Sequence, residues 1–431
     1  MTDPIDFFSE QRWTLGVVGL GYVGLPLAVT AAEKGLGVIG FDVSAARADA
    51  LMAGSSHVED VSDAELASAL ATGALFTADA ANLARADAVI ICVPSPLGRN
   101  RQPDLSFIEA AAATVEAIAR PGQLISLEST TYPGTTEDII LPAVQRAGLE
   151  LDRDVWVVFS PERVSPGDVM KTGDIPKIVG GITPMSSEVG AAAYRRVVSS
   201  VHPVSSARAA EMAKLLENTY RAVNIGLINE MAQLANKLDI DIWEVVEAAA
   251  TKPFGFQPFS PGPGVGGHCI PLDPQYLAWR AREAGFATRV IDVAEQVNTM
   301  MPAYNADRVA DILNERGLPV HGTPILGVGI AYKPDIADDR ESASLDVLAD
   351  LRKRGAKVSV MDPLIGDDRI RRHGYEPVGQ GADLSGFALA AVLCDHDVID
   401  FAALAAAVPV VFDARGAYRK RKIDADNVIA L

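Results

Sequence analysis

Cys269 stands in a polar, glycine-rich stretch of the sequence, just ahead of Asp273 and Pro274. Glycine lets a backbone pass close to a ligand, and Asp followed by Pro is typical of the N-cap and first residue of a helix. The helix dipole and unbonded N–H groups favour the thiolate of a cysteine at such a point. The setting therefore predicts a nucleophile at Cys269. The alternative, a small buried hydrophobic residue, suits Cys92 and Cys394, which lie in apolar runs typical of strands.

A Gly-x-Gly-x-x-Gly motif follows an apolar strand and opens a helical run near the start of the chain. Gly19 permits the tight turn, Gly21 lets a pyrophosphate approach the backbone, and Gly24 lets the helix pack on the strand. The next apolar strand ends at Asp42, whose carboxylate can bind both ribose hydroxyls. This order of elements predicts a dinucleotide site that favours NAD over NADP.

The composition limits the classes of protein that the chain can represent. Its 431 residues, 49% of them hydrophobic, suit two or three domains. No apolar stretch has the length of a membrane span and the first residues do not resemble a signal peptide, so we expect a cytoplasmic protein. Three cysteines without paired spacing predict neither disulfides nor a metal site. The net charge of −18 disfavours nucleic acid and membrane surfaces as partners, and requires locally basic sites for any nucleotide.

Alternating strand-like and helical runs predict an α/β fold. One long amphipathic run, from Ser206 to Lys237, predicts a connecting helix. A second alternating pattern begins near residue 324 and lacks the glycine motif. We therefore predict two Rossmann-like doubly wound units joined by a long central helix and a helical domain. The expected boundaries are 1–203 for an NAD-binding domain, 204–303 for a helical domain, and 304–431 for the second Rossmann-like domain.

Lys214, Asn218 and Arg221 share one face of the long helix. Their pattern alone is typical of a solvated charged face. Apolar residues on the other sides of the helix instead suggest burial, in which case the lysine can act as a general base and the asparagine can orient a water or an alkoxide.

Other polar residues follow predicted strands, at the carboxyl edge where such sheets bind ligands. Thr130 is placed to contact substrate, whereas spacing alone favours a surface ion pair for Glu162. Lys333 could bind a phosphate or a uracil-type carbonyl, and Arg340 could reach a cofactor, although both also fit ordinary surface cations.

Six motifs, taken in order, resemble the nucleotide-sugar 6-dehydrogenases of the UDP-glucose/GDP-mannose dehydrogenase family. They are Gly19–Pro26, Ser129–Thr130, Ser160–Arg163, Lys214–Arg221, Gly266–Pro274 and Tyr332–Ser342. The resemblance covers nearly the whole chain. It implies an N-terminal NAD domain, a central helical domain that forms a homodimer, and a C-terminal domain that binds UDP.

The resemblance also implies a role for each residue. Cys269 would be the nucleophile, Lys214 and Asn218 would stabilise an oxyanion, Asp273 and Thr130 would organise water and proton transfers, and Glu162 would be the general base in thioester hydrolysis. Residues expected at the cofactor are Gly19, Gly21, Tyr22, Val23, Gly24, Asp42, Arg47, Pro94, Thr130 and Arg340. Those expected at the substrate are Glu162, Arg163, Lys214, Asn218, Arg221, Phe259, Gly266, His268 and Lys333.

Two features resemble the N-acetylhexosamine branch of this family: the run Arg163–Gly167, which follows Pro161 and Glu162, and His268 beside the cysteine. Residues 251–264 resemble the N-acetylglucosamine enzymes and lead into the Cys269 bend. The implied reaction is NAD-dependent oxidation of C6 of UDP-N-acetylglucosamine to the uronic acid, by two hydride transfers through a thiohemiacetal and a thioester. The alternatives are UDP-N-acetylmannosamine, then UDP-glucose. A hydroxy-acid or 6-phosphogluconate-type dehydrogenase, or a non-catalytic NAD-binding sensor, would make Cys269 dispensable.

Overall fold

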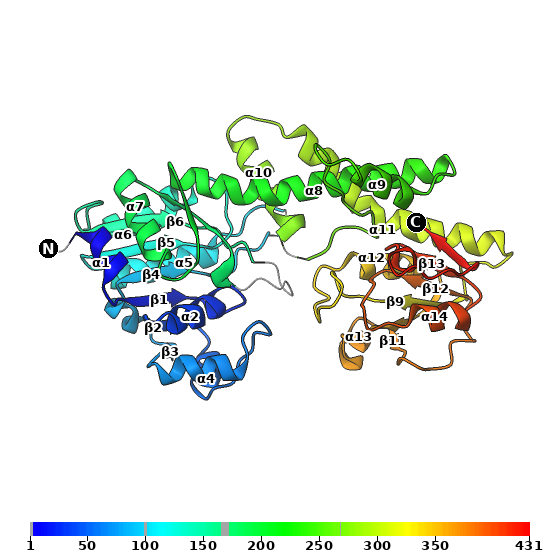
Figure 1. Cartoon of the computed structure of the whole chain (residues 1–431), viewed down its shortest axis with the longest axis horizontal. Coiled ribbons are helices and arrows are strands. Elements are labelled where there is room, and N and C mark those ends of the chain that lie inside the picture. Colours follow the sequence, from blue (N-terminus) through cyan, green and yellow to red (C-terminus); the bar gives the residue numbers. More distant parts are fainter. Residues whose placement is uncertain (1–2, 99–100, 165–171, 268) are drawn as a thin grey trace. The chain divides into compact units, whose positions relative to one another are not determined.

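The computed structural model describes residues 3–98, 101–164, 172–267 and 269–431. Their contacts divide the chain into two compact units, coloured mainly blue to green and green to red in Figure 1. The first unit comprises residues 1–217 and 275–286, and the second comprises residues 218–274 and 287–431. Among the described residues, no helix is both long enough and apolar enough to cross a membrane.

The first unit is built on an eight-stranded sheet (Figure 1). In chain order its strands are β1 (Thr14–Val18), β2 (Gly37–Phe41), β3 (Leu75–Thr77), β4 (Ala88–Ile91), β5 (Gln123–Leu127), β6 (Val155–Phe159), β7 (Lys177–Gly181) and β8 (Val201–Val204). Their spatial order, β3-β2-β1-β4-β5-β6-β7-β8, begins as a dinucleotide-binding sheet does, with a ligand crevice between β1 and β4. The predicted doubly wound sheet is confirmed. One pair departs from parallel, because β7 runs antiparallel to β6.

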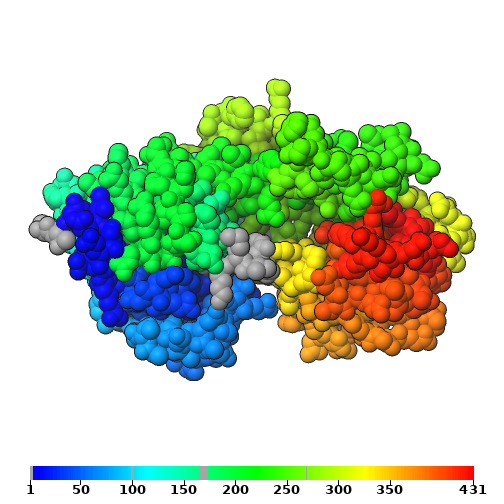
Figure 2. Space-filling view, viewed as in Figure 1, coloured from blue at the N-terminus to red at the C-terminus, as the bar shows by residue number. Residues whose placement is uncertain are grey.

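Helices cover both faces of this sheet. They are α1 (Pro4–Glu10), α2 (Gly24–Glu33), α3 (Ala45–Met52), α4 (Asp63–Ala71), α5 (Ser106–Ile118), α6 (Leu141–Arg146) and α7 (Pro184–Tyr194). Side chains alternate across a strand, so Leu15 and Val17 of β1 join the core under α2, α4 and α7, whereas Val18 joins the core under α5 and α6. Figure 2 shows α1 as a blue patch beside the green surface of this unit, where α1 contacts α7.

The second unit contains a six-stranded parallel sheet in the order β11-β10-β9-β12-β13-β14. Its strands are β9 (Pro324–Val328), β10 (Lys357–Met361), β11 (Glu376–Pro377), β12 (Leu389–Val392), β13 (Val411–Asp413) and β14 (Val428–Ala430). Its shorter helices are α12 (Ala343–Lys353), α13 (Asp367–Arg372), α14 (Phe401–Ala407) and α15 (Ala417–Lys420). Counted from β9, the strand order repeats that of β1 to β6, so this unit is a second Rossmann-like sheet.

The remaining helices are α8 (Ala207–Lys237), α9 (Ile242–Ala250), α10 (Cys269–Glu283) and α11 (Arg289–Glu315). The predicted connecting helix is confirmed to within one residue by α8. The predicted start of the next helix is wrong, because α10 is already helical at Cys269, four residues before Asp273. Pro274 therefore lies inside the helix, where it has no N–H to donate to the preceding turn.

Candidate active site

The glycine motif forms a turn in which Gly19 and Gly24 leave no room for a side chain. Gly19 has a φ of +92°, and a Cβ there would lie 2.7 Å from the carbonyl oxygen of Cys92. A Cβ on Gly24 would overlap the carbonyl oxygen of Gly19, whereas nothing lies within 4 Å of a Cβ on Gly21. No side chain caps α2, and within the turn the N–H of Leu25 donates to the carbonyl oxygen of Gly21 at 3.1 Å. This geometry fits the pyrophosphate of a dinucleotide.

Asp42 follows β2 and is almost fully buried. Its carboxylate accepts hydrogen bonds from Leu20 N at 3.1 Å, Ser44 N at 3.0 Å and Arg47 Nη1 at 2.9 Å. Burial alone would raise the pKa of Asp42, but these donors outweigh it and hold the pKa below its usual range. A carboxylate offers about four acceptor positions, so one remains for a ribose hydroxyl.

The other residues predicted at the cofactor in the first unit follow neighbouring strands. Val23 is the N-cap of α2 and Tyr22 beside it is exposed. Pro94 follows β4 and is exposed, and Thr130 follows β5 and is half-buried. Because β1, β2, β4 and β5 are parallel, all of these residues lie at one edge of the sheet.

Glu162 and Lys214 meet in the first unit through the backbone. Lys214 is buried, and its Nζ donates to the carbonyl oxygen of Glu162 at 2.6 Å. The side chain of Glu162 is also buried: Oε1 accepts from Arg163 N at 2.7 Å and Val164 N at 2.6 Å, while Oε2 lies 3.3 Å from Nζ of Lys177. The surface ion pair that spacing alone favoured for Glu162 is therefore wrong.

These neighbours set the charge of Glu162. Burial would raise the pKa of Glu162, but the charge of Lys177, the two backbone donors and the charge of Lys214 together lower it. Arg163 forms a pair with Glu217 at 2.6 Å and donates to the carbonyl oxygen of Pro176.

Two buried acids in the first unit escaped the sequence analysis as site residues. Glu128 follows β5, and its Oε2 lies 2.7 Å from Nζ of Lys177, the lysine that also contacts Glu162. Glu211, on α8, accepts from Gly134 N, Thr136 N and Thr136 Oγ1, and thereby fixes the loop that follows Thr130. A charged residue that ends an apolar run, as Glu128 does, was the signal that could have found the first acid.

In the second unit, Cys269 is exposed at the first residue of α10. One turn further along, Asp273 is buried and its Oδ2 accepts from Nδ2 of Asn218 at 2.5 Å. Asn218 is buried as well, whereas Arg221, predicted on the same face, is exposed. The predicted burial of this helix face is therefore right for Lys214 and Asn218 and wrong for Arg221.

The bend before Cys269 depends on its glycines. A Cβ on Gly266 would lie 2.7 Å from the carbonyl oxygen of Glu341, and one on Gly267, whose φ is +79°, would lie 2.8 Å from the ring of Tyr332. The bend therefore packs directly against the segment that follows β9.

Phe259 stacks edge-on against Tyr220 at 5.9 Å between ring centroids. The predicted contact His268 lies outside the described residues.

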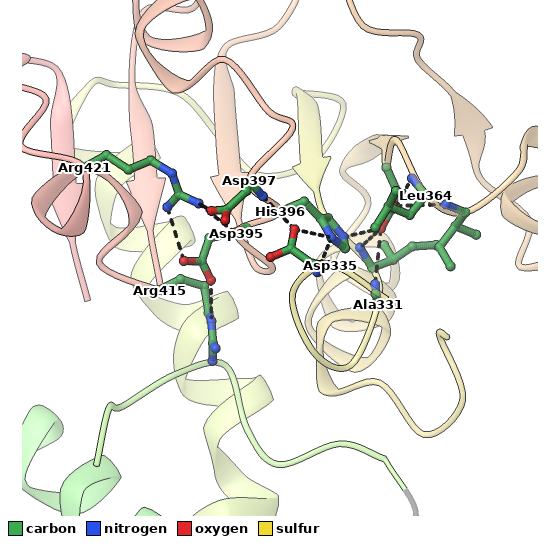
Figure 3. Close-up of polar contacts among 11 residues, drawn as sticks. Ala331, Asp335, Leu364, Asp395, His396, Asp397, Arg415 and Arg421 are labelled. Atoms are coloured by element: carbon green, nitrogen blue, oxygen red, sulfur yellow. Dashed lines mark hydrogen bonds and ion pairs between the residues drawn. The ribbon is translucent and has the colours of Figure 1, made fainter. Parts of the chain in front are cut away.

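Lys333 and Arg340 lie in the loop after β9, at the edge where this sheet would bind a ligand. Arg340 is exposed and paired with Asp338 at 2.6 Å. Figure 3 shows how the loop is held: Asp335 donates from its N–H to Nδ1 of His396 at 2.9 Å, and its carboxylate accepts from Asp397 N at 2.8 Å.

The buried ring of His396 in turn contacts Asp362, with 3.3 Å between Nε2 and Oδ2. Nearby, Asp395 accepts hydrogen bonds from Arg415 and Arg421 (Figure 3). This network fixes the loop to the carboxyl ends of β10 and β12.

Two doubly wound sheets, one with an intact dinucleotide turn, and a cysteine exposed at a helix start define a nicotinamide-dependent dehydrogenase. The chain belongs to the UDP-glucose/GDP-mannose dehydrogenase family. It matches the NAD binding domain of that family over residues 13–198, the central domain over 208–300 and the UDP binding domain over 326–420. These ranges fall inside the three predicted domains, whose own boundaries stay a prediction.

Individual relatives agree with the family. The chain is 36% identical over 369 residues to a UDP-N-acetyl-D-glucosamine 6-dehydrogenase of Pseudomonas aeruginosa, covering 85% of this chain and 86% of the relative. It is 35% identical over 372 residues to a UDP-N-acetyl-D-mannosamine dehydrogenase of Pyrococcus horikoshii, covering 86% and 87%. A solved structure of UDP-D-ManNAc dehydrogenase from Pyrococcus horikoshii matches with a TM-score of 0.86 and 30% identity, over 97% and 98% of the two chains. The protein is thus an NAD-dependent UDP-sugar dehydrogenase.

Proposed function

We propose that this protein oxidises C6 of UDP-N-acetylglucosamine to the uronic acid through a covalent bond to Cys269. The observation that carries the proposal is the exposed thiol at the first residue of α10, one helical turn before the buried Asn218–Asp273 contact. A thiol at this point is the group that can hold an aldehyde between two oxidation steps. A single oxidation would need no such group.

In the proposed reaction, the glycine turn and Asp42 would hold NAD, which would supply a hydride acceptor for C6, one NAD molecule for each of the two oxidations. The thiolate of Cys269 adds to the aldehyde carbon, and Lys214 and Asn218 stabilise the oxyanion that forms. One such donor can contribute about 3 kcal/mol. After the second oxidation the sugar is held as a thioester. Glu162 then takes a proton from a water as the water oxygen bonds to the carbonyl carbon, and the C–S bond breaks to release the thiolate.

The choice of sugar rests on the residues before the bend. Phe254 and Phe256 are exposed on this segment, and Gln257 accepts a hydrogen bond from the Tyr220 hydroxyl at 3.0 Å. An acetamido group has a methyl, a carbonyl and an N–H, for which apolar surface and an amide are suitable partners. Relatives that carry the gluco and the manno names match equally well, so the manno epimer is the second candidate.

The test is to supply purified protein with NAD and each of UDP-N-acetylglucosamine, UDP-N-acetylmannosamine and UDP-glucose. We expect two NADH per sugar and the highest kcat/KM for the gluco N-acetyl sugar. A site that pairs the acetamido group should reject UDP-glucose, because its polar partners would be left unsatisfied. One NADH per sugar would contradict the covalent route. A preference for UDP-glucose would contradict the assignment to N-acetylhexosamine substrates. A preference for UDP-N-acetylmannosamine would contradict only the proposed configuration at C2.

We further propose a homodimer formed through the helical segment of the second unit. Its support is a row of exposed apolar side chains at spacings of four and seven residues, with Tyr220, Leu227 and Leu234 on α8 and Leu238 directly after the end of that helix. Such a row is typical of a helix face that packs on another helix. Light scattering of wild type and Leu227→Glu tests it. A wild-type monomer would contradict the proposal.

A further inference from the structure

Lys177 has no role in the reaction described above, yet it lies at the centre of a buried polar cluster in the first unit. Its Nζ lies 2.7 Å from Oε2 of Glu128, 3.3 Å from Oε2 of Glu162 and 3.4 Å from the carbonyl oxygen of Pro161. Only 3% of the lysine side chain is exposed. A lone charge buried to this extent would cost several kcal/mol, so the ammonium depends on these partners.

The antiparallel β6–β7 pair explains how the lysine reaches this position. Lys177 is the first residue of β7, and the first residue of a parallel strand would lie at the opposite edge of the sheet from the site. The register pairs Val158 with Gly181 and Phe159 with Gly180. Continued past the end of β6, that register sets Lys177 opposite Glu162. The reversal of one strand therefore delivers a cation to the carboxyl edge.

A second layer fixes the other side of the lysine. Tyr194 donates from its hydroxyl to Oε1 of Glu128 at 2.6 Å and lies 2.8 Å from the hydroxyl of Ser126. Glu128 and Tyr194 are themselves buried. The hydrogen bond from Tyr194 to Oε1 orients the Glu128 carboxylate so that Oε2 faces the ammonium of Lys177.

Several charged or titratable groups among the described residues surround Glu162, including the adjacent Arg163 and, on the far side of Glu128, Tyr194. The charges of Lys177 on β7 and Lys214 on α8 both lower the pKa of Glu162, and burial raises the pKa of Glu128 after β5 although Lys177 opposes that effect. The thiol of Cys92 after β4 faces the same cluster, where burial raises its pKa and keeps it neutral. Burial lowers the pKa of Lys177, but the two carboxylates more than reverse this effect. Lys177 therefore stays charged across the working pH range.

We propose that Lys177, oriented by Glu128, is a positioning residue that keeps the Glu162 carboxylate ionised and fixes the Glu162 carbonyl that receives Lys214. The inference rests on the proposed role of Glu162 as the base that hydrolyses the thioester. A protonated Glu162 could not take a proton from water. A displaced Glu162 carbonyl would release Nζ of Lys214, which it holds at 2.6 Å.

The competing account is a purely structural ion pair, and pH separates the two. Lys177→Met removes the charge at similar volume but leaves Glu128 buried without its partner. The double variant Lys177→Met with Glu128→Gln removes both charges and keeps an acceptor for Tyr194, so it is the informative protein. Glu128→Gln alone removes the orienting carboxylate but keeps the Lys177 charge beside Glu162, so it separates the effect of that charge on pH dependence from loss of the Glu128 carboxylate.

The experiment measures kcat from about pH 5.5 to 9 with the UDP-sugar that the wild type oxidises. Loss of an opposite charge at this distance raises a carboxyl pKa by about 1–3 units. We therefore expect the ratio of kcat, variant to wild type, to rise with pH by about tenfold or more for both proteins that lack Lys177 and to stay flat for Glu128→Gln. KM should change far less than kcat. Intact mass of enzyme quenched at low pH should show the sugar adduct on Cys269 accumulating in the double variant.

Two outcomes would overturn the proposal: a ratio independent of pH in the double variant, or a mass spectrum without adduct at the pH where that variant is slow. Either result would leave only a structural ion pair, visible as a lower Tm. The wild-type yield of NADH is measured separately. A yield of one per sugar would reject the covalent function itself, whereas a yield of two with a flat ratio would reject only the role of Lys177.

Discussion

The amide of Asn218 donates a 2.5 Å hydrogen bond to the carboxylate of Asp273, and both side chains are buried. The contact joins α8 to the first turns of α10, the helix that begins at Cys269. It fixes which way the amide of Asn218 faces, because its nitrogen must point to the carboxylate. A residue proposed to stabilise an oxyanion is thereby held by a neighbour on the same helix as the nucleophile.

Exchanging this pair tests the roles of its two members. Asn218→Asp places two carboxylates together, which raises the pKa of the pair and should lower kcat by about 10²-fold near neutral pH. The double variant, Asn218→Asp with Asp273→Asn, restores an amide–carboxylate hydrogen bond in reverse. We expect it to recover Tm but not kcat. Recovery of both would show that the contact is only structural.

Cys269→Ser should abolish formation of the acid and leave NAD binding unchanged, since a serine hydroxyl without a dedicated base is a poor nucleophile. Steady-state NADH production and a titration with NAD measure the two properties. Cys394→Ser, at a buried cysteine after β12, controls for loss of a thiol as such. Substantial activity in Cys269→Ser would be incompatible with a covalent route.

The cofactor preference should depend on Asp42 and Arg47. The 2′-phosphate of NADP would meet the Asp42 carboxylate, so we expect kcat/KM to favour NAD strongly. In the wild type, Arg47 pairs with Asp42 at 2.9 Å. Asp42→Ser removes the repulsion and leaves Arg47 able to contact the 2′-phosphate. We expect Asp42→Ser to reduce the ratio of kcat/KM for NAD to kcat/KM for NADP. The double variant, Asp42→Ser with Arg47→Ala, should lose the improved use of NADP. Equal use of both cofactors by the wild type would contradict the assignment.

The free energy of unfolding should decrease as the pH rises, because of Glu211. Burial raises the pKa of Glu211 from 4.5 to about 7, against the hydrogen bonds from Gly134 and Thr136 that lower it. The folded chain therefore binds this proton more tightly than the unfolded chain. That stabilisation is complete below about pH 4.5 and is lost as the pH rises through about 7.

Glu211→Gln cannot titrate, so the Tm of wild type minus that of Glu211→Gln should decrease from about pH 5 to pH 8. The exposed Glu230 lies on the same helix, and Glu230→Gln is the control that should show no such trend. A Tm difference that is constant with pH would show that Glu211 does not titrate in this range.

The sequence was sufficient for the features that local patterns determine. Gly-x-Gly-x-x-Gly with Asp42 predicted the dinucleotide turn, and the spacing of apolar residues predicted α8. The Lys177 cluster could not be predicted, because it depends on β7 running against β6, and strand direction has no local signature. The start of α10 was misplaced for a related reason: Asp273 resembles an N-cap by type, but its carboxylate is used by Asn218 from another helix.

The two sheets end their second strand in the same way, with an aspartate that holds the turn after the first strand, but the two carboxylates differ in free capacity. Asp42 has three donors. Asp362 has five, namely the N–H groups of Ile330, Ala331, Leu364 and Ile365 and the ring of His396. A carboxylate with about four acceptor positions is saturated by five donors. Adding a glycine motif to the second sheet would therefore not be enough to make it bind a nicotinamide cofactor. Some of the hydrogen-bond donors to Asp362 would also have to be removed, because otherwise its carboxylate has no acceptor position left for the ribose.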